Sequence, residues 1–174
     1  SAGTYAARVA SGSAGGTYRL SVSVFPKIND GVNCTTYTST GAAVAIPTGP
    51  TLIASTIVVP GNPRIEDLDV SISLSHTRMS DLDVELTAPG GNTVGLFTDI
   101  GTSGQNGMEM TLDDEAALPV TPFLALSQTV FAPETNYRLA WFDGQPAGGT
   151  WTLSIRDDTS GEGGTLQNWS LRIC

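Results

Sequence analysis

Residues 148–158 read GGTWTLSIRDD and residues 163–173 read GGTLQNWSLRI, and these two stretches decide the fold of the 174-residue chain. In each stretch, large apolar side chains stand at every second position, with Trp151 or Trp169 leading two aliphatic residues. Because successive side chains of a β-strand point to opposite faces of its sheet, the spacing predicts two strands with one buried face each. A bulky aromatic residue followed by aliphatic ones suits the interior of a β-sandwich. The Gly-rich residues between the stretches predict a loop that joins the two strands.

The rest of the chain is also β in character. Residues 52–59 form a β-branched run, while residues 68–74 and 82–86 alternate apolar and polar side chains. Residues 94–98 and 108–112 read as two further short strands. Apolar positions at helical spacing are scarce, and turn residues separate the strand-like segments. The pattern predicts an all-β chain folded as a sandwich or jelly roll.

The charge of the chain limits its partners. Seventeen acidic residues against eight basic ones give a net charge of −9. Nucleic acids and anionic membranes attract basic surfaces, so neither is expected as a partner. The chain has no run of about eighteen apolar residues that would form a membrane-spanning helix. The composition fits an extracellular protein or one that binds cations, and an acidic surface that only maintains solubility is the alternative.

Residues 1–33 read as a separate segment. Two similar strand-like units, residues 3–9 and 16–24, are joined by a turn rich in Gly, Ser and Ala, which predicts a β-hairpin. Residues 26–31 then read as a linker with Asn, Asp and Gly as turn residues. We therefore expect an N-terminal hairpin and linker in residues 1–33 and the main domain in residues 34–174.

The two cysteines mark the ends of the main domain. Cys34 precedes its first residues, and Cys174 ends the chain directly after a predicted strand. A disulfide between them would tie both ends of one domain together, and so long a closed loop is worth roughly 4–5 kcal/mol in the loop-entropy model. We expect this disulfide, which would imply an oxidising compartment; two buried free thiols are the alternative.

Five blocks of the main domain resemble one known family. The blocks are residues 65–77, ending in a His-Thr pair; residues 81–91, similar to D-L-x-V-x-L-x-S-P-x-G; residues 111–116, similar to F-D-D-x-A; residues 142–153, similar to F-x-G-x-x-x-x-G-x-W-x-L; and a closing hairpin in residues 148–173. Together they resemble the P-domain, also called the P/Homo B domain, which follows the catalytic domain of kexin-like and many bacterial subtilisin-type proteases. Many members read R-G-D-L where this chain has Arg78-Met79-Ser80-Asp81-Leu82, so no role of an R-G-D triplet carries over.

The resemblance implies a jelly-roll β-sandwich of about eight strands and a non-catalytic role. It implies an accessory domain that packs on the catalytic domain of a secreted subtilisin-like serine protease, supports its folding and stability, and contacts protein substrate. Residues 1–33 resemble the end of a bacterial pre-peptidase C-terminal domain, which implies the tail of a preceding accessory domain. We expect the chain to be extracellular and monomeric. A carbohydrate- or extracellular-matrix-binding module is the alternative function.

The single histidine, His76, raises the question of catalysis. A Ser-His-Asp arrangement would use it as the general base, but the chain contains no G-x-S-x-G motif around a nucleophilic serine. His76 also continues the apolar face of residues 68–74. We therefore expect a packed or turn-capping histidine and no catalytic residue in this chain.

Four carboxylates, Asp67, Asp69, Asp83 and Glu85, occupy polar positions in or beside the two alternating segments. Paired acid–base hydrolysis would need two carboxyl groups that flank a cleft and have pKa values pushed apart. A solvated strand face explains the pattern more simply, and we expect that these side chains lie in water.

The loop that begins at Asp99 is the candidate metal site. Asp113 and Asp114 close this loop, and Gly, Gln and Asn residues lie between. Calcium takes about six to eight oxygen ligands from carboxylates, amides and backbone carbonyls, which this composition supplies. Calcium also occurs in several bacterial domains of the kind that the chain resembles. We expect Ca²⁺ at these three aspartates; aspartates that accept hydrogen bonds from turn amides are the alternative.

Three tryptophans present a further choice. Trp141, Trp151 and Trp169 could form a sugar-stacking platform, as in carbohydrate-binding jelly rolls. Their spacing among apolar residues favours burial instead, so we expect all three indoles in the core. The outer surface would then carry no reactive machinery.

Overall fold

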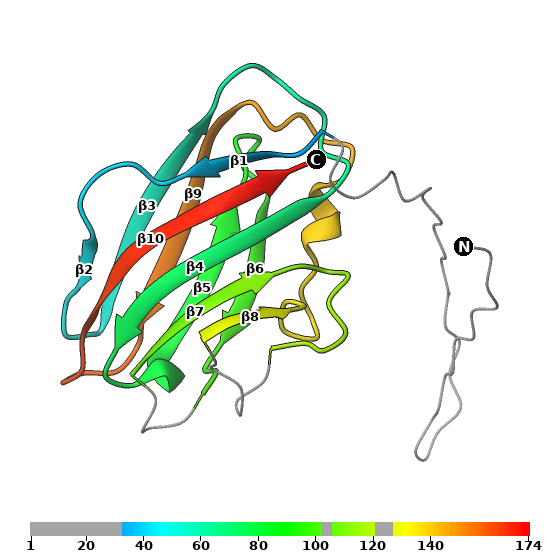
Figure 1. Cartoon of the computed structure of the whole chain (residues 1–174). Helices are drawn as coiled ribbons and strands as arrows, with labels where there is room; N and C mark the ends of the chain where they lie inside the picture. The colour runs from blue at the N-terminus through cyan, green and yellow to red at the C-terminus, as the bar shows by residue number, and fades with distance from the viewer. Residues whose placement is uncertain (1–32, 102–105, 121–126) are drawn as a thin grey trace, which may run out of the picture.

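The chain folds into two packed β-sheets (Figure 1). The computed structural model describes residues 33–101, 106–120 and 127–174. In these residues, ten strands and two short 3₁₀ helices follow one another along the chain. They are β1 Thr35–Thr38, β2 Val44–Ile46, β3 Thr51–Val59, β4 Leu68–His76, η1 Met79–Asp81, β5 Leu82–Thr87, β6 Thr93–Thr98, β7 Gly107–Leu112, β8 Ser127–Phe131, η2 Leu139–Phe142, β9 Gly149–Asp157 and β10 Gly164–Ile173.

The strands form one larger and one smaller sheet. The larger sheet has the order β1-β10-β4-β7-β8, with β2 also paired to β10, and the smaller sheet has the order β3-β9-β5-β6. All neighbours pair antiparallel except β7 and β8, which run parallel. The predicted all-β sandwich is confirmed, with ten strands in the described residues where about eight were expected.

The two tryptophan-led strands face each other across the core. Trp151 on β9 and Trp169 on β10 are both fully buried. However, β9 pairs with β3 and β5, whereas β10 pairs with β1, β2 and β4, so the two strands belong to different sheets. The expected closing hairpin is therefore wrong, because residues 158–163 cross from one sheet to the other. Alternation fixes which face of a strand is buried but not which strand lies beside it.

The two alternating segments form central strands, one in each sheet. β4 lies between β10 and β7, and β5 lies between β9 and β6. Val70 and Ile72 on β4, and Val84 and Leu86 on β5, are almost completely removed from water. Burying a side chain of this size stabilises the fold by roughly 1.5–3 kcal/mol before entropy is counted. These inward faces therefore hold the two sheets together.

Both buried indoles have a partner for their polar atom. Trp151 Nε1 donates a hydrogen bond to the Ala147 carbonyl oxygen at 2.8 Å, and Trp169 Nε1 donates to Ser55 Oγ at 2.9 Å. The Phe142 ring packs edge-on against Trp151, with 5.2 Å between ring centres. Satisfied N–H groups let these large side chains lie in the core without a desolvation penalty. The expectation of core tryptophans is confirmed for these two.

The predicted hairpin of residues 3–24 lies outside the described residues, so the division between residues 33 and 34 stays a prediction. Among the described residues, no helix has the length and apolar character that a membrane span requires.

Candidate functional site

His76 and Asp157 form a buried pair between the two sheets. His76 is the last residue of β4 in the larger sheet, and Asp157 is the last residue of β9 in the smaller one. Both side chains are fully buried, with His76 Nε2 3.3 Å from Asp157 Oδ2. Asp157 Oδ1 accepts a hydrogen bond from the Thr159 backbone N–H at 3.1 Å, and His76 Nδ1 lies 2.8 Å from the Arg78 carbonyl oxygen. The pair thus joins the sheets at one end of the sandwich.

These surroundings give His76 a structural role. In the part of the chain that the structure describes, its ring bonds to Asp157 and to the Arg78 backbone, and to no serine, threonine or cysteine side chain. A general base needs a nucleophile within hydrogen-bond reach. The expectation of a packed, turn-capping histidine is confirmed.

Asp157 was not among the predicted site residues, although the sequence contains a signal for it. Asp157 stands two residues after Ile155, at the next inward position of the series that starts with Trp151. His76 likewise stands two residues after Leu74. On each strand, the alternating buried positions thus end in a polar residue. A buried polar group needs a hydrogen-bond partner, so each of these two residues is a candidate partner for the other.

Five carboxylates gather at this same end of the sandwich, and we refer to Asp81, Asp83, Asp99, Glu134 and Asp158 as the first acidic cluster. The Asp158 backbone N–H donates to the Asp81 carbonyl oxygen at 3.1 Å, which places the ends of η1 and β9 side by side. Burial, followed by the neighbouring carboxylates, raises the pKa values of Asp83 and Asp99. Burial and the neighbouring carboxylates thus favour the protonated forms of Asp83 and Asp99 more than water does for an isolated aspartate.

Asp81 is the buried member of the first acidic cluster. Its side chain is 6% exposed, and Arg78 Nε lies 3.3 Å from its Oδ1. Its Oδ2 is buried and has no hydrogen-bond partner. Only one of the two carboxylate oxygens of Asp81 therefore has a partner.

A second acidic cluster lies at the opposite end, beyond the first residues of β4 and the last residue of β7. It consists of Asp67, Asp69, Asp113, Asp114 and Asp143. Burial, followed by the Asp67 and Asp114 carboxylates, raises the pKa of Asp143 to about 6. The two ends of the sandwich therefore each carry a concentration of negative charge.

The structure does not bring the three predicted calcium ligands together. Asp99 belongs to the first acidic cluster, while Asp113 and Asp114 belong to the second, beyond the six-residue strand β7 that spans roughly 20 Å. In residues 33–101, 106–120 and 127–174, no group of three or more His, Cys, Asp or Glu side chains is placed to hold a metal ion. One ion held by all three aspartates does not fit this arrangement, and calcium binding stays a prediction.

Asp113 and Asp114 have partners in the fold itself. Asp113 Oδ1 accepts a hydrogen bond from the Glu115 backbone N–H at 2.7 Å, which closes a turn. The Asp114 carboxylate accepts hydrogen bonds from the N–H groups of Leu139 and Ala140, at 3.1 and 2.8 Å. These are the first N–H groups of η2, which have no partner within the helix. Asp114 therefore anchors η2 to the end of β7.

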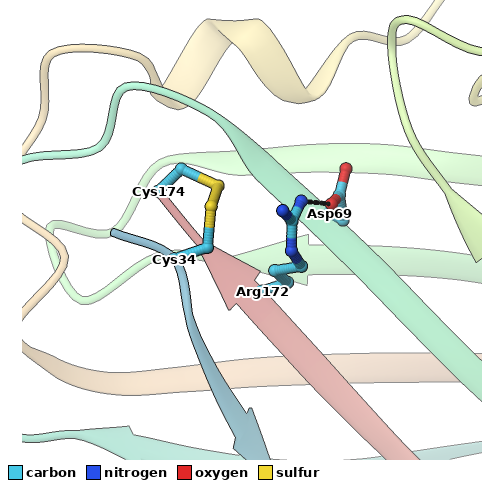
Figure 2. The surroundings of a disulfide bond; sticks show 4 residues. All are labelled: Cys34, Asp69, Arg172 and Cys174. Carbon is cyan, nitrogen blue, oxygen red and sulfur yellow. Dashed lines mark hydrogen bonds and ion pairs between the residues drawn. A yellow bond between two sulfur atoms is a disulfide. The ribbon is translucent and has the colours of Figure 1, made fainter. Parts of the chain in front are cut away.

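The predicted disulfide is present at the end of the sandwich that carries the second acidic cluster. Cys34 and Cys174, which are 140 residues apart in the sequence, are bonded with an S–S distance of 2.03 Å (Figure 2). Cys34 precedes β1 and Cys174 follows β10, and these two strands pair antiparallel. The Cys174 backbone N–H also donates to the Asp67 carbonyl oxygen at 3.0 Å. The disulfide thus fixes the short strand β1 to the last strand of the chain.

Asp69 does not lie in water as the sequence analysis expected. It is 7% exposed, its Oδ2 lies 2.8 Å from Arg172 Nη1 (Figure 2), and its buried Oδ1 has no hydrogen-bond partner. Burial raises the pKa of Asp69 and the hydrogen bond from Arg172 lowers it, and the net pKa is about 6. The expectation is wrong because β4 is a central strand, so neighbouring side chains cover its outer face. Asp83 and Glu85 lie on β5, in the other sheet.

Trp141 is exposed over 56% of its surface, so the expectation of three buried indoles is wrong for this residue. The segment around it forms η2 rather than a strand. In a 3₁₀ helix, residues three apart share one face, and Leu139 and Phe142 take the buried face here. Trp141 is consequently turned towards solvent.

An open groove crosses the outer face of the larger sheet. It has a volume of about 320 Å³ and is lined from β4, β7, β8 and β10 by Ser71, Ile72, Ser73, Glu109, Met110, Thr111, Val130 and Asn168. The hydroxyl groups of Ser71 and Thr111 are hydrogen-bonded to each other at 2.8 Å. No aromatic residue is among these lining residues, so the groove offers hydrogen bonds but no ring on which a sugar could stack.

Comparison with known families gives the class of the domain. The family model of the proprotein convertase P-domain matches residues 65–173, which is more than half of the chain. The chain therefore belongs to the proprotein convertase P-domain family, as its sequence blocks indicated. The P-domain is a non-catalytic accessory domain, in agreement with the structural role of His76.

Three similar proteins can be compared with this chain, and two of them are much longer than it. The transglutaminase-activating metalloprotease of Streptomyces mobaraensis is 29% identical over 130 residues, which cover 74% of this chain and 14% of that protein. The serine protease of Aeromonas sobria, solved in complex with the chaperone ORF2, is 22% identical with a TM-score of 0.49, over 82% of this chain and 26% of that chain. FlhE is 13% identical with a TM-score of 0.44, over 82% of this chain and 96% of that chain.

Proposed function

We propose that this chain is the accessory domain of a secreted protease and that it supports the folding and stability of the catalytic domain. The P-domain match over residues 65–173 carries the proposal. The continuous hydrophobic core and the Cys34–Cys174 disulfide support it, because together they form a body with its own stability. A disulfide of this kind also fits an extracellular compartment.

We further propose that the partner is a subtilisin-like serine protease. The five sequence blocks resemble P-domains that follow such enzymes, while a curated relative is by its name a metalloprotease. Inhibition of the full-length protein distinguishes the two classes. Loss of activity with phenylmethylsulfonyl fluoride supports the serine class, and loss with a zinc chelator alone contradicts it.

The folding role is tested by producing the full-length protease with and without residues 34–174. We expect a much lower yield of active enzyme without these residues, partly restored when the isolated chain is added during refolding. Trp151→Ala, which opens a cavity in the core, should reproduce the loss, whereas Glu85→Ala on the exposed face of β5 should not. An undiminished yield without the domain contradicts the proposal.

Trp141 is the residue that we propose for contact with protein substrate. Exposed tryptophans dominate many protein interfaces, because a large rigid ring is desolvated at little entropic cost. Trp141→Ala in the full-length protease should raise KM for a folded protein substrate and leave KM for a short peptide unchanged. Leu118→Ala, at another exposed apolar residue, is the matched control. Equal KM values for the protein substrate contradict this role.

The hydroxyl-rich groove supports one alternative, a carbohydrate- or matrix-binding module. Its Ser, Thr and Asn side chains can bond to hydroxyl groups of a glycan. Retention of the isolated chain on insoluble polysaccharide or collagen, lost in Ser73→Trp, would favour this alternative. A chain that is not retained on either material would contradict the binding-module alternative.

A further inference from the structure

Strand β3 is a long edge strand without the protection that such strands usually have. It comprises nine residues, pairs with β9 on one side, and has no paired strand on its other side among the described residues. Its register with β9 runs from Thr51 to Val59 without a bulge. Thr51–Val59 contains no charged residue and no proline. Soluble proteins normally place lysine, proline or a bulge on such an edge to prevent pairing with another chain.

The outer side of β3 is open to solvent. Leu52 and Val58, whose side chains point away from the core, are exposed over 68% and 67% of their surface. The inward residues Ile53 and Ser55 are only half-buried, whereas Ile57 is 4% exposed. The inward face along the first half of β3 is therefore only partly covered in the described structure.

The sequence of β3 is complementary to itself. If two copies of the strand pair antiparallel about Ser55, Leu52 of one copy lies opposite Val58 of the other, and the reverse. In the same register, Ile53 lies opposite Ile57, and Thr51 opposite Val59. Each of the two exposed large apolar residues of the strand would thus be covered by the other residue from the second copy, because directly opposite side chains on one face are in contact.

We propose that β3 is a self-association edge and that its partner is a second copy of this chain. A two-fold axis at Ser55 would join both smaller sheets into one continuous eight-stranded sheet. Such a contact is self-complementary and closed, so it ends at the dimer. The chain as a whole carries a net charge of −9, which opposes association, and β3 is free of that charge. This proposal departs from the monomer expected from the sequence, and the oligomeric state decides between the two.

The test is the mass of the whole chain in solution, measured by sedimentation equilibrium over a range of concentrations. We expect a monomer–dimer equilibrium for the unaltered chain. Leu52→Lys with Val58→Lys places equal charges opposite each other and should weaken dimerisation at least tenfold. Leu52→Glu with Val58→Lys should restore it, because opposite charges then face each other across the two-fold axis in this register alone. Val130→Lys, on the edge strand of the other sheet, is the matched control.

Other results overturn the proposal. A chain that stays monomeric at about 1 mM, a concentration at which even weak pairs form, has no such dimer. A dimer that survives the double lysine variant uses another surface. Hydrogen exchange identifies any other occupant of the edge. Alternate β3 amides donate to β9 and are protected in any case. Concentration-independent protection of the remaining β3 amides, which point to the open edge, means that a segment of the same chain covers the strand. Circular dichroism and melting of each variant show that the fold is kept.

Discussion

At one end of the sandwich, the His76 imidazole and the Asp157 carboxylate share a site from which water is excluded. Each residue occupies the last inward position of its strand, where continued alternation would place an apolar side chain. A buried polar group without a partner costs several kcal/mol, so each residue depends on the other. The packing of His76 was predicted from the sequence, whereas the burial of Asp157 and its contact with His76 were not, because they depend on how the sheets face each other.

His76→Ala should lower the free energy of unfolding by roughly 3 kcal/mol, because it leaves the Asp157 carboxylate buried without its partner. The measurement is urea unfolding of the whole chain. His76→Ala combined with Asp157→Ala should recover part of the loss, since the uncompensated carboxylate is then gone. Glu85→Ala, on an exposed position, is the control. A single variant no less stable than this control would contradict the account of the pair.

The carboxyl groups of Asp69 and Asp143 predict how stability depends on pH. Both have pKa values raised from the ordinary 3.8 to about 6, mainly by burial. The folded chain therefore binds protons more tightly than the unfolded chain, and the contribution to stability is complete below about pH 4 and lost as the pH rises through 6. Asp69→Asn with Asp143→Asn should raise the melting temperature at neutral pH and leave it unchanged near pH 4. Equal effects at both pH values would contradict the assignment.

Calcium binding is tested through the same melting temperature. We expect EDTA to lower the melting temperature and added Ca²⁺ to restore it, because a ligand that binds the folded chain alone stabilises it. Asp99 and Asp113 lie at opposite ends of β7, so Asp99→Asn and Asp113→Asn should not both abolish the response. A melting temperature that is the same with EDTA and with Ca²⁺ would contradict the prediction of calcium binding.

At the scale of the elements, the strands with clear alternation could be predicted from the sequence. β4, β5, β9 and the second half of β10 have an apolar residue at every second position, and all four strands are where the pattern placed them. The pairing of β9 with β3 and β5, instead of with β10, could not be predicted, because pairing is decided by contacts far apart in the sequence. The 3₁₀ helix η2 was missed for a related reason: its core contacts, rather than its local sequence, select the buried residues.

The disulfide is predicted to hold β1 in place. β1 has four residues and pairs with β10 next to the Cys34–Cys174 bond. Cys34→Ser with Cys174→Ser should lower the free energy of unfolding by roughly 4–5 kcal/mol, because the unfolded chain regains the freedom of a very long loop. Hydrogen exchange should show that the β1 amides lose protection first. A variant with unchanged stability and unchanged β1 protection would contradict this role.

At the scale of the whole molecule, the described residues form two sheets around one hydrophobic core, in a chain that belongs to a family of non-catalytic accessory domains. The hydrophobic core runs through both sheets, the one histidine is fixed between them, and the carboxylates gather at the two ends. The family could be identified from the sequence because its blocks lie on strands and turns that the fold requires. The candidate sites were harder to predict. Trp141 was expected in the core and is exposed, whereas Asp69 was expected in water and is buried, because neighbouring elements decide the exposure of both side chains.

Stabilisation of a protease catalytic domain is the proposed function of this domain. The most direct measurement is the half-life of thermal inactivation of the full-length protease, compared with the same enzyme after removal of residues 34–174. We expect a half-life at least tenfold shorter without the domain, because the contacts that brace the catalytic domain are then absent. Equal half-lives of the two enzymes would contradict the claim.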